Sequence, residues 1–210
     1  MIQHKFFEHA LLAFCFLVLF SFDSSAQSDS GRVAMQVEPS YDVTLHMLIG
    51  SNDGVKGDLP ASLADVSKQL KANFNFSSYR LASTFLGRIS NTGTFEYKSV
   101  GDLGGRNVDG AAPTLTFLEW TIASLRSMPT VKGRPGFQAQ AFRFGARVPV
   151  QTTTFQGESG KGSTVYNYES IGLSLAKIGL AENTPTLIGT LNLPGANGTI
   201  FLIMTVRATD

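Results

Sequence analysis

The sequence predicts an α+β fold that is mainly antiparallel β-sheet, arranged as a sandwich or a curled sheet, with one amphipathic helix packed on a sheet. Segments with strand composition, many of them alternating apolar and polar residues, cover most of the chain. Turn residues separate these segments at short intervals. A single segment shows the spacing of an amphipathic helix. We therefore expect a helical content well below the average of globular proteins.

The helix is expected at residues 58–74. Its apolar residues recur every three or four positions and fall on one stripe: Leu59, Leu63, Val66, Leu70 and Phe74. Asp58 has a side chain suited to the N-cap position, and Pro60 is tolerated in a first helical turn. We expect the stripe to be buried against a sheet.

The other ordered segments have the composition of strands. The sequence predicts them at 41–49, 78–89, 94–100, 114–125, 137–150, 151–155, 163–168, 170–178, 186–193 and 199–208. Pro149 is expected to end the strand that starts at residue 137, because proline cannot donate a hydrogen bond to a neighbouring strand.

Composition divides the chain into four ranges. Residues 1–26 have a polar start with Lys5, an apolar run at 10–20 and small residues before a cleavage point after Ala26, which is the pattern of a secretory signal peptide. Range 27–100 is a strand–helix–strand–hairpin region, range 101–113 is a glycine-rich loop, and range 114–210 is all-β. One continuous domain over 33–208 is the alternative.

The signal peptide predicts an extracytoplasmic protein, located in a bacterial periplasm, at the outer membrane or outside the cell. The single cysteine, Cys15, lies in the apolar run, so the exported chain has no disulfide and no thiolate nucleophile. A lipid anchor at Cys15 is disfavoured because Phe14 precedes it where a small residue is needed. A net charge of only +1 argues against nucleic acid as a partner.

No group of residues predicts catalysis, a metal site or a cofactor. Residues 157–164 faintly resemble a phosphate-binding loop, but Phe155 stands where the first glycine is needed and Gly162 stands where Ser or Thr must follow Lys161. His46 is the only histidine after the signal peptide, so a His-based metal site is excluded. A serine–histidine pair would have to use His46, and no Gly-x-Ser-x-Gly motif is present.

Glu119 and Trp120 form a candidate ligand-binding pair. A carboxylate and an aromatic platform are what a sugar-binding or sugar-cleaving site needs. Neighbours on a strand, however, point to opposite faces of the sheet. The stronger interpretation is a solvated Glu119 with Trp120 in the core.

Four arginines on or beside predicted strands are further binding candidates. They are Arg80, Arg88, Arg143 and Arg147, and each has an aromatic residue nearby in sequence. A guanidinium in such a place can bind a carboxylate, a sugar or a protein partner. The more common role is an ion pair with Asp or Glu across strands.

Four short motifs follow one another in the last third of the chain, within residues 137–208. They are Phe144–Val150, Tyr166–Leu175, Thr186–Leu191 and Thr199–Val206. Their order resembles the C-terminal, membrane-inserting part of bacterial secretins, the outer-membrane ring proteins of secretion and type IV pilus systems. The proline that secretins have after the second motif is absent, since Ala176 follows. The resemblance implies assembly at the outer membrane, and it carries over no functional residue.

These observations favour an exported, non-catalytic cell-envelope protein that acts by binding or assembly, as a secretin-like accessory of secretion or pilus systems. Its partner would be an envelope protein or further copies of itself. The alternative is a carbohydrate- or ligand-binding β-sandwich that uses Trp120 with Glu119 or the strand arginines.

Overall fold

Strands make up most of the structure. The computed structural model describes residues 38–54, 57–101, 103, 115–131, 133–156, 162–194 and 198–209. In these residues the elements are β1 (Ser40–Ser51), a 3₁₀ turn (Ala61–Leu63), α2 (Ala64–Asn73), β2 (Ser78–Ser90), β3 (Thr94–Gly101), β4 (Thr116–Val131), β5 (Arg134–Gln156), β6 (Gly162–Ala181), β7 (Thr186–Asn192) and β8 (Gly198–Ala208). The predicted signal peptide at 1–26 lies outside the described residues, as does most of the predicted glycine-rich loop at 101–113.

The strands form two four-stranded sheets. Sheet A has the order β2-β1-β8-β7, and sheet B has the order β3-β4-β5-β6. Neighbouring strands in both sheets are antiparallel. The predicted class, a mainly antiparallel sheet system with one packed helix, is confirmed. Sheet A combines strands from the predicted 27–100 and 114–210 ranges, so both ranges contribute to one core.

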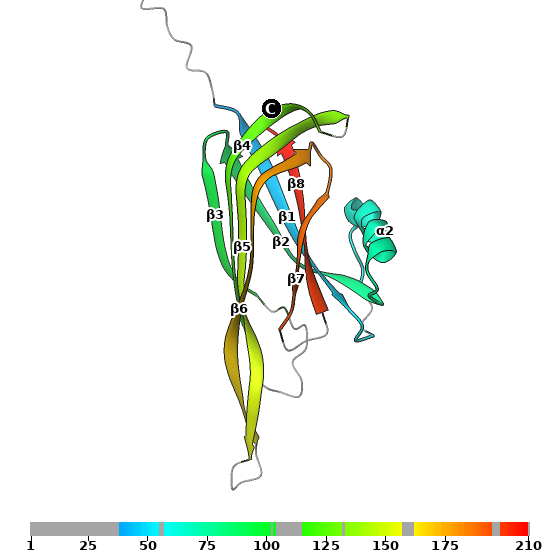
Figure 1. Ribbon diagram of the computed structural model, residues 1–210, viewed down its shortest axis with the longest axis vertical. Coiled ribbons are helices and arrows are strands. Elements are labelled where there is room, and N and C mark those ends of the chain that lie inside the picture. The colour runs from blue at the N-terminus through cyan, green and yellow to red at the C-terminus, as the bar shows by residue number, and fades with distance from the viewer. Residues whose placement is uncertain are drawn as a thin grey trace, which may run out of the picture. The chain divides into compact units, whose positions relative to one another are not determined.

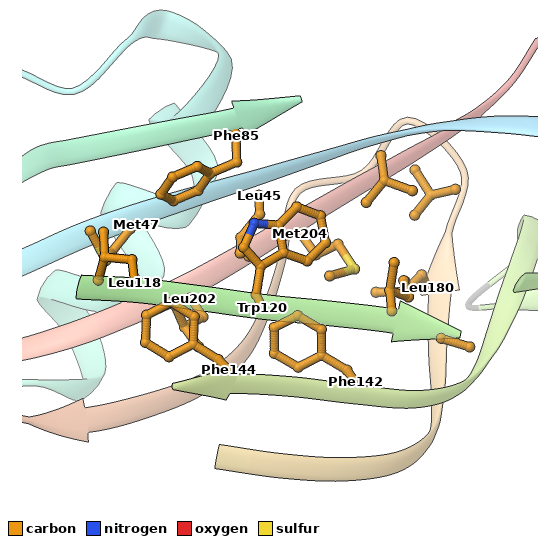
Figure 2. Close-up of a cluster of buried hydrophobic side chains, with 14 of the residues drawn as sticks. Leu45, Met47, Phe85, Leu118, Trp120, Phe142, Phe144, Leu180, Leu202 and Met204 are labelled. Atoms are coloured by element: carbon orange, nitrogen blue, oxygen red, sulfur yellow. The ribbon is translucent and has the colours of Figure 1, made fainter. Parts of the chain in front are cut away.

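A large apolar core lies between the two sheets. Its centre is Trp120 of β4, whose ring lies 5.0 Å from that of Phe95 and 6.3 Å from that of Phe142, measured between centroids. Figure 2 shows Trp120 on the side of β4 where Leu45 and Met204 of sheet A also lie. The inward residues alternate along β4, with Leu118, Trp120 and Ile122 all buried. This is the period of two that a half-buried strand requires.

A second, smaller core lies between α2 and the other face of sheet A (Figure 1). Leu63, Val66 and Leu70 of the predicted helical stripe are buried there, against Phe201 and Ile203 of β8. The prediction that this stripe faces a sheet is confirmed. β8 is consequently buried on both faces, which explains why consecutive residues from Ile200 to Met204 are all apolar.

Tyr79 of β2 closes the C-terminal end of α2. Its hydroxyl donates to the backbone carbonyl oxygens of Leu70, at 3.0 Å, and Phe74, at 3.1 Å. The last carbonyls of a helix have no partner within the helix. Tyr79 therefore supplies donors for the helix end, and its buried ring packs at 5.7 Å from Phe201.

The helix begins later than the sequence predicted. The prediction placed its start at residue 58 with Asp58 as N-cap. The 3₁₀ turn instead begins at Ala61, after an extended Pro60 with ψ 147°, and no side chain caps it. The reason is steric: a residue before proline is disfavoured in the helical region, so Leu59 remains outside the helix.

Pro149 does not end its strand, contrary to the prediction. β5 continues to Gln156, and Pro149 pairs with Tyr168 of β6. The pairing of β5 with β4 stops at Arg147. Beyond that point no described strand pairs with the other edge of β5, so the missing N–H of Pro149 can face that edge. The paired residues 148–156 and 162–169 form a two-stranded ribbon that extends beyond the sheet, here called the arm (Figure 1).

Sheet B bends at one row of residues. Ser124 of β4 and Lys177 of β6 have positive φ angles of 49° and 54°. In the register of the sheet, both residues lie opposite Gln140 of β5. The residue pairs immediately before and after this position are regular. The Ser124 N–H donates to the Gly93 carbonyl at 2.8 Å. Past this row the strands curve toward sheet A (Figure 1), and Phe137 packs on Tyr41 at 4.9 Å.

The helix stripe gives a direct test of the second core. We expect Leu70→Ala to lower the free energy of unfolding by about 2–5 kcal/mol, because it removes buried contacts and leaves a cavity. Lys68→Ala is the matched control on the same helix, since its side chain is 81% exposed, and it should change stability by less than about 0.5 kcal/mol. Urea unfolding measures both, and equal midpoints would contradict the packing of α2.

Candidate functional site

The outer face of sheet B is the candidate site. It carries the side chains that alternate with the core residues of β3, β4, β5 and β6, and no other described element is packed on it. The members that matter here are Glu96, Lys98, Val100, Phe117, Glu119, Arg143, Gly145, Arg147, Tyr166, Tyr168 and Gly172. Three of the six predicted binding residues, Glu119, Arg143 and Arg147, are brought together there.

A shallow hollow of about 550 Å³ lies on this face, near the base of the arm. Its lining crosses all four strands and includes Lys98, Glu119 and Gly145, which are successive partners in one row. The Glu119 side chain extends over β5, because a Cβ at Gly145 would lie only 3.1 Å from its Oε1 atom. Glycine at position 145 thus leaves the space that the carboxylate occupies.

Charges of both signs surround the hollow. Glu96 and Lys98 form an ion pair at 2.7 Å on β3. The hydrogen bond to Glu96 raises the pKa of Lys98, and the charge of Glu119 adds to this effect. On the neighbouring strand, Arg143 and Arg147 each lie two residues from Gly145, the register partner of Glu119. Neither guanidinium forms an ion pair with any described residue.

An exposed apolar strip runs from the hollow onto the arm. Val100 of β3 is paired with Phe117 of β4, and the Phe117 ring lies 5.7 Å from that of Tyr168. Tyr166 lies two residues before Tyr168 in β6, on the same face of the strand. The exposed fractions of these side chains are 49% for Val100, 48% for Phe117, 42% for Tyr168 and 36% for Tyr166. Large apolar groups with this much exposure gather here on one face.

Trp120 belongs to the core. Its side chain is 1% exposed and points away from Glu119, to the inner face of sheet B. Its indole Nε1 atom has no hydrogen-bond partner among the described residues. A ring in this position cannot serve as a platform for a ligand on the outer face.

Arg80 and Arg88 lie in the other sheet, on β2. Arg80 donates to the backbone carbonyl of Leu103. Arg88 binds Asp42 Oδ1 through its Nε atom at 2.8 Å, and Arg207 binds the second oxygen of Asp42 at 3.0 Å. The hydrogen bond from Arg88, followed by that from Arg207, holds the pKa of Asp42 below its usual range. Arg88 therefore forms the cross-strand ion pair that the second interpretation expects, whereas the partner of Arg80 is a backbone carbonyl.

The described residues hold no cluster of metal ligands. No group of three or more His, Cys, Asp or Glu among them is placed to bind a metal ion. His46 accepts from or donates to the Thr84 hydroxyl at 3.0 Å, and burial lowers its pKa. No helix in the described part of the chain is long and apolar enough to cross a membrane. Residues 157–161 of the segment that resembles a phosphate-binding loop lie outside the described residues.

Sequence reasoning missed the aromatic strip. Phe117 lies in a stretch of β4 where both alternating phases contain apolar residues, so the pattern did not show which phase faces solvent. The signal that could have identified the strip is the alternation of side chains along each strand. Phe117 is on the same face as the charged Glu119, and Tyr168 is on the same face as Ser170.

Comparison with known proteins adds no assignment: no protein-family model matches the chain, and none of the curated proteins matches it. The structure by itself defines the class, which is a two-sheet β-sandwich with a helix on one sheet and an uncovered, partly aromatic face on the other.

The ion pair between Asp42 of β1 and Arg88 of β2 can be tested by titration. The folded-state pKa of Asp42 is depressed, so its contribution to stability is present above the unfolded pKa and is lost as pH falls through the folded pKa. We expect Arg88→Ala to raise the Asp42 pKa toward its ordinary value, so that this loss occurs at higher pH. Carboxyl ¹³C NMR titration measures it. Arg143→Ala, on the other sheet, should leave Asp42 unchanged, and an unshifted Asp42 in Arg88→Ala would contradict the assigned cause.

Proposed function

We propose that this protein is an exported, non-catalytic component of the cell envelope that acts by binding or assembly through the outer face of sheet B. The observation that carries the proposal is the exposed strip of Val100, Phe117, Tyr166 and Tyr168 beside charged groups. The predicted signal peptide supports export, and the resemblance of residues 137–208 to secretins supports an accessory role at the outer membrane in secretion or pilus systems.

The composition of this face supports binding to a macromolecule. Soluble monomers rarely expose contiguous apolar patches, and a patch with a polar rim is typical of an interaction site. Tyrosine and arginine dominate the energetics of protein interfaces. Arg147 lines the hollow, and Tyr168 lies on the adjacent strand, two residues before the lining residue Ser170. The arm extends the same face beyond the sheet, which enlarges the surface that a partner can cover.

A second candidate function is binding of a carbohydrate or another small ligand. The observation that favours it is the hollow itself, in which the Glu119 carboxylate and the Arg147 guanidinium lie beside the Phe117 ring. In this version Phe117 and Tyr168 take the platform role that the sequence assigned to Trp120. A glycan array with the exported protein separates the two functions, since binding that is lost in Tyr168→Ala would favour the ligand.

Site-specific cross-linking in the envelope tests the proposed interaction face. A photoreactive amino acid in place of Tyr168 should give protein adducts, because that position lies in the strip. The same amino acid in place of Leu86, which is 71% exposed on sheet A, is the matched control and should give few. Phe117→Ser should reduce the Tyr168 adducts about tenfold or more, as loss of a central aromatic contact does. The wild-type melting temperature should be retained.

Equal adduct yields from the two positions would show that the strip is not a preferred contact. The complete absence of adducts at position 168, with the protein correctly located, would count against the proposed function as a whole.

A further inference from the structure

We propose that the partner of the outer face of sheet B is a second copy of this chain, related by a two-fold axis. This inference rests on the proposed function and names its partner. The argument depends on which charges this face carries, where they stand, and which of them lack partners within one chain.

The face has the charge pattern of a self-complementary surface. Glu119 lies on β4, and Arg147 lies on the adjacent strand β5, two residues from Gly145, which is the register partner of Glu119. The two side chains form no ion pair with each other or with another described residue. A two-fold axis that lies in the plane of the interface, midway between them, places each Glu119 opposite the partner's Arg147. One symmetric contact then forms two ion pairs.

Phe117 lies near that axis. It is on the same strand as Glu119, two residues away, and it is the register partner of Arg147. Its backbone is therefore close to those of both charged residues, since two residues along a strand span about 7 Å and adjacent strands are about 5 Å apart. An axis that exchanges Glu119 and Arg147 brings the two Phe117 side chains near each other. The most exposed aromatic group of the face thus becomes the centre of the contact.

Two glycines permit the two sheets to approach. Gly145 and Gly172 add no side chains of their own to the row of Glu119, and the Glu119 carboxylate extends over Gly145. Packed sheets lie about 10 Å apart when their side chains interdigitate. Side chains of one copy, such as Tyr168, can enter the hollow of the other.

Mixed charge distinguishes this partner from others. A strongly acidic partner would meet Glu119 and Glu96, and a strongly basic one would meet Arg143 and Arg147. A second copy presents both signs in matching positions. Charged groups stand beside the apolar strip of this face, whereas permanent interfaces are more hydrophobic, so we expect a weak, concentration-dependent dimer rather than a permanent one.

Charge reversal tests this arrangement. Sedimentation velocity of the exported, purified protein from micromolar to millimolar concentration should show a monomer–dimer equilibrium. Glu119→Arg and Arg147→Glu, each alone, place like charges opposite one another and should raise the dimer Kd about tenfold or more. The double variant restores opposite charges across the axis and should recover most of the wild-type Kd. Lys68→Glu on α2 changes net charge as Arg147→Glu does and should leave Kd unchanged.

Three results would overturn the proposal: a wild-type protein that stays monomeric throughout, single reversals that leave Kd unaltered, or a double variant no better than the singles. Failure here differs from failure of the proposed function. If a photoreactive group at Tyr168 captures an envelope protein while the chain itself remains monomeric, the interaction face stands and the second copy is excluded. If position 168 captures nothing and the chain remains monomeric, both are excluded.

Discussion

Burial of β8 on both of its faces is the constraint on which the rest of the structure depends. Leu202 and Met204 of β8 pack into the core with sheet B, whereas Phe201 and Ile203 pack under α2. A strand buried on both faces must also have its backbone groups paired on both edges, and β8 lies between β1 and β7. Neither covering layer can be lost without exposing apolar side chains of the central strands.

The core between the sheets also fixes the candidate site. Because side chains alternate along a strand, the positions of Leu118 and Trp120 in the core force Phe117 and Glu119 outward. A slip of one residue in the pairing of β4 would exchange the two sets. The interaction face is therefore held in place by the same residues that stabilise the sandwich, and the ring contacts around Trp120 position Glu119 from the opposite side of the sheet.

The bend in sheet B allows its apolar face to follow sheet A to the end of the sandwich. Along β4 the buried residues are Ile122 and then Leu125, three positions apart, with Ser124 between them in a left-handed conformation. The strand changes phase at the bend, so its apolar side chains stay inward after it turns. At the other end, β5 and β6 run on past the last pairing with β4, and the side chains of residues 151–153 and 165–169 there are exposed.

Local periodicity in the sequence determined which segments are strands, and it determined the buried stripe of the helix, because these depend on near neighbours. Glu119 and the two sheet B arginines were also recognisable as surface groups. The tertiary structure decided the rest. The open edge of β5 lets Pro149 remain in a strand, which no local pattern shows. Phe117 and Tyr168 are apolar residues in strands that have apolar residues in both phases. Only the placement of α2 over sheet A, with none of the described elements over sheet B, determined that these two rings face solvent.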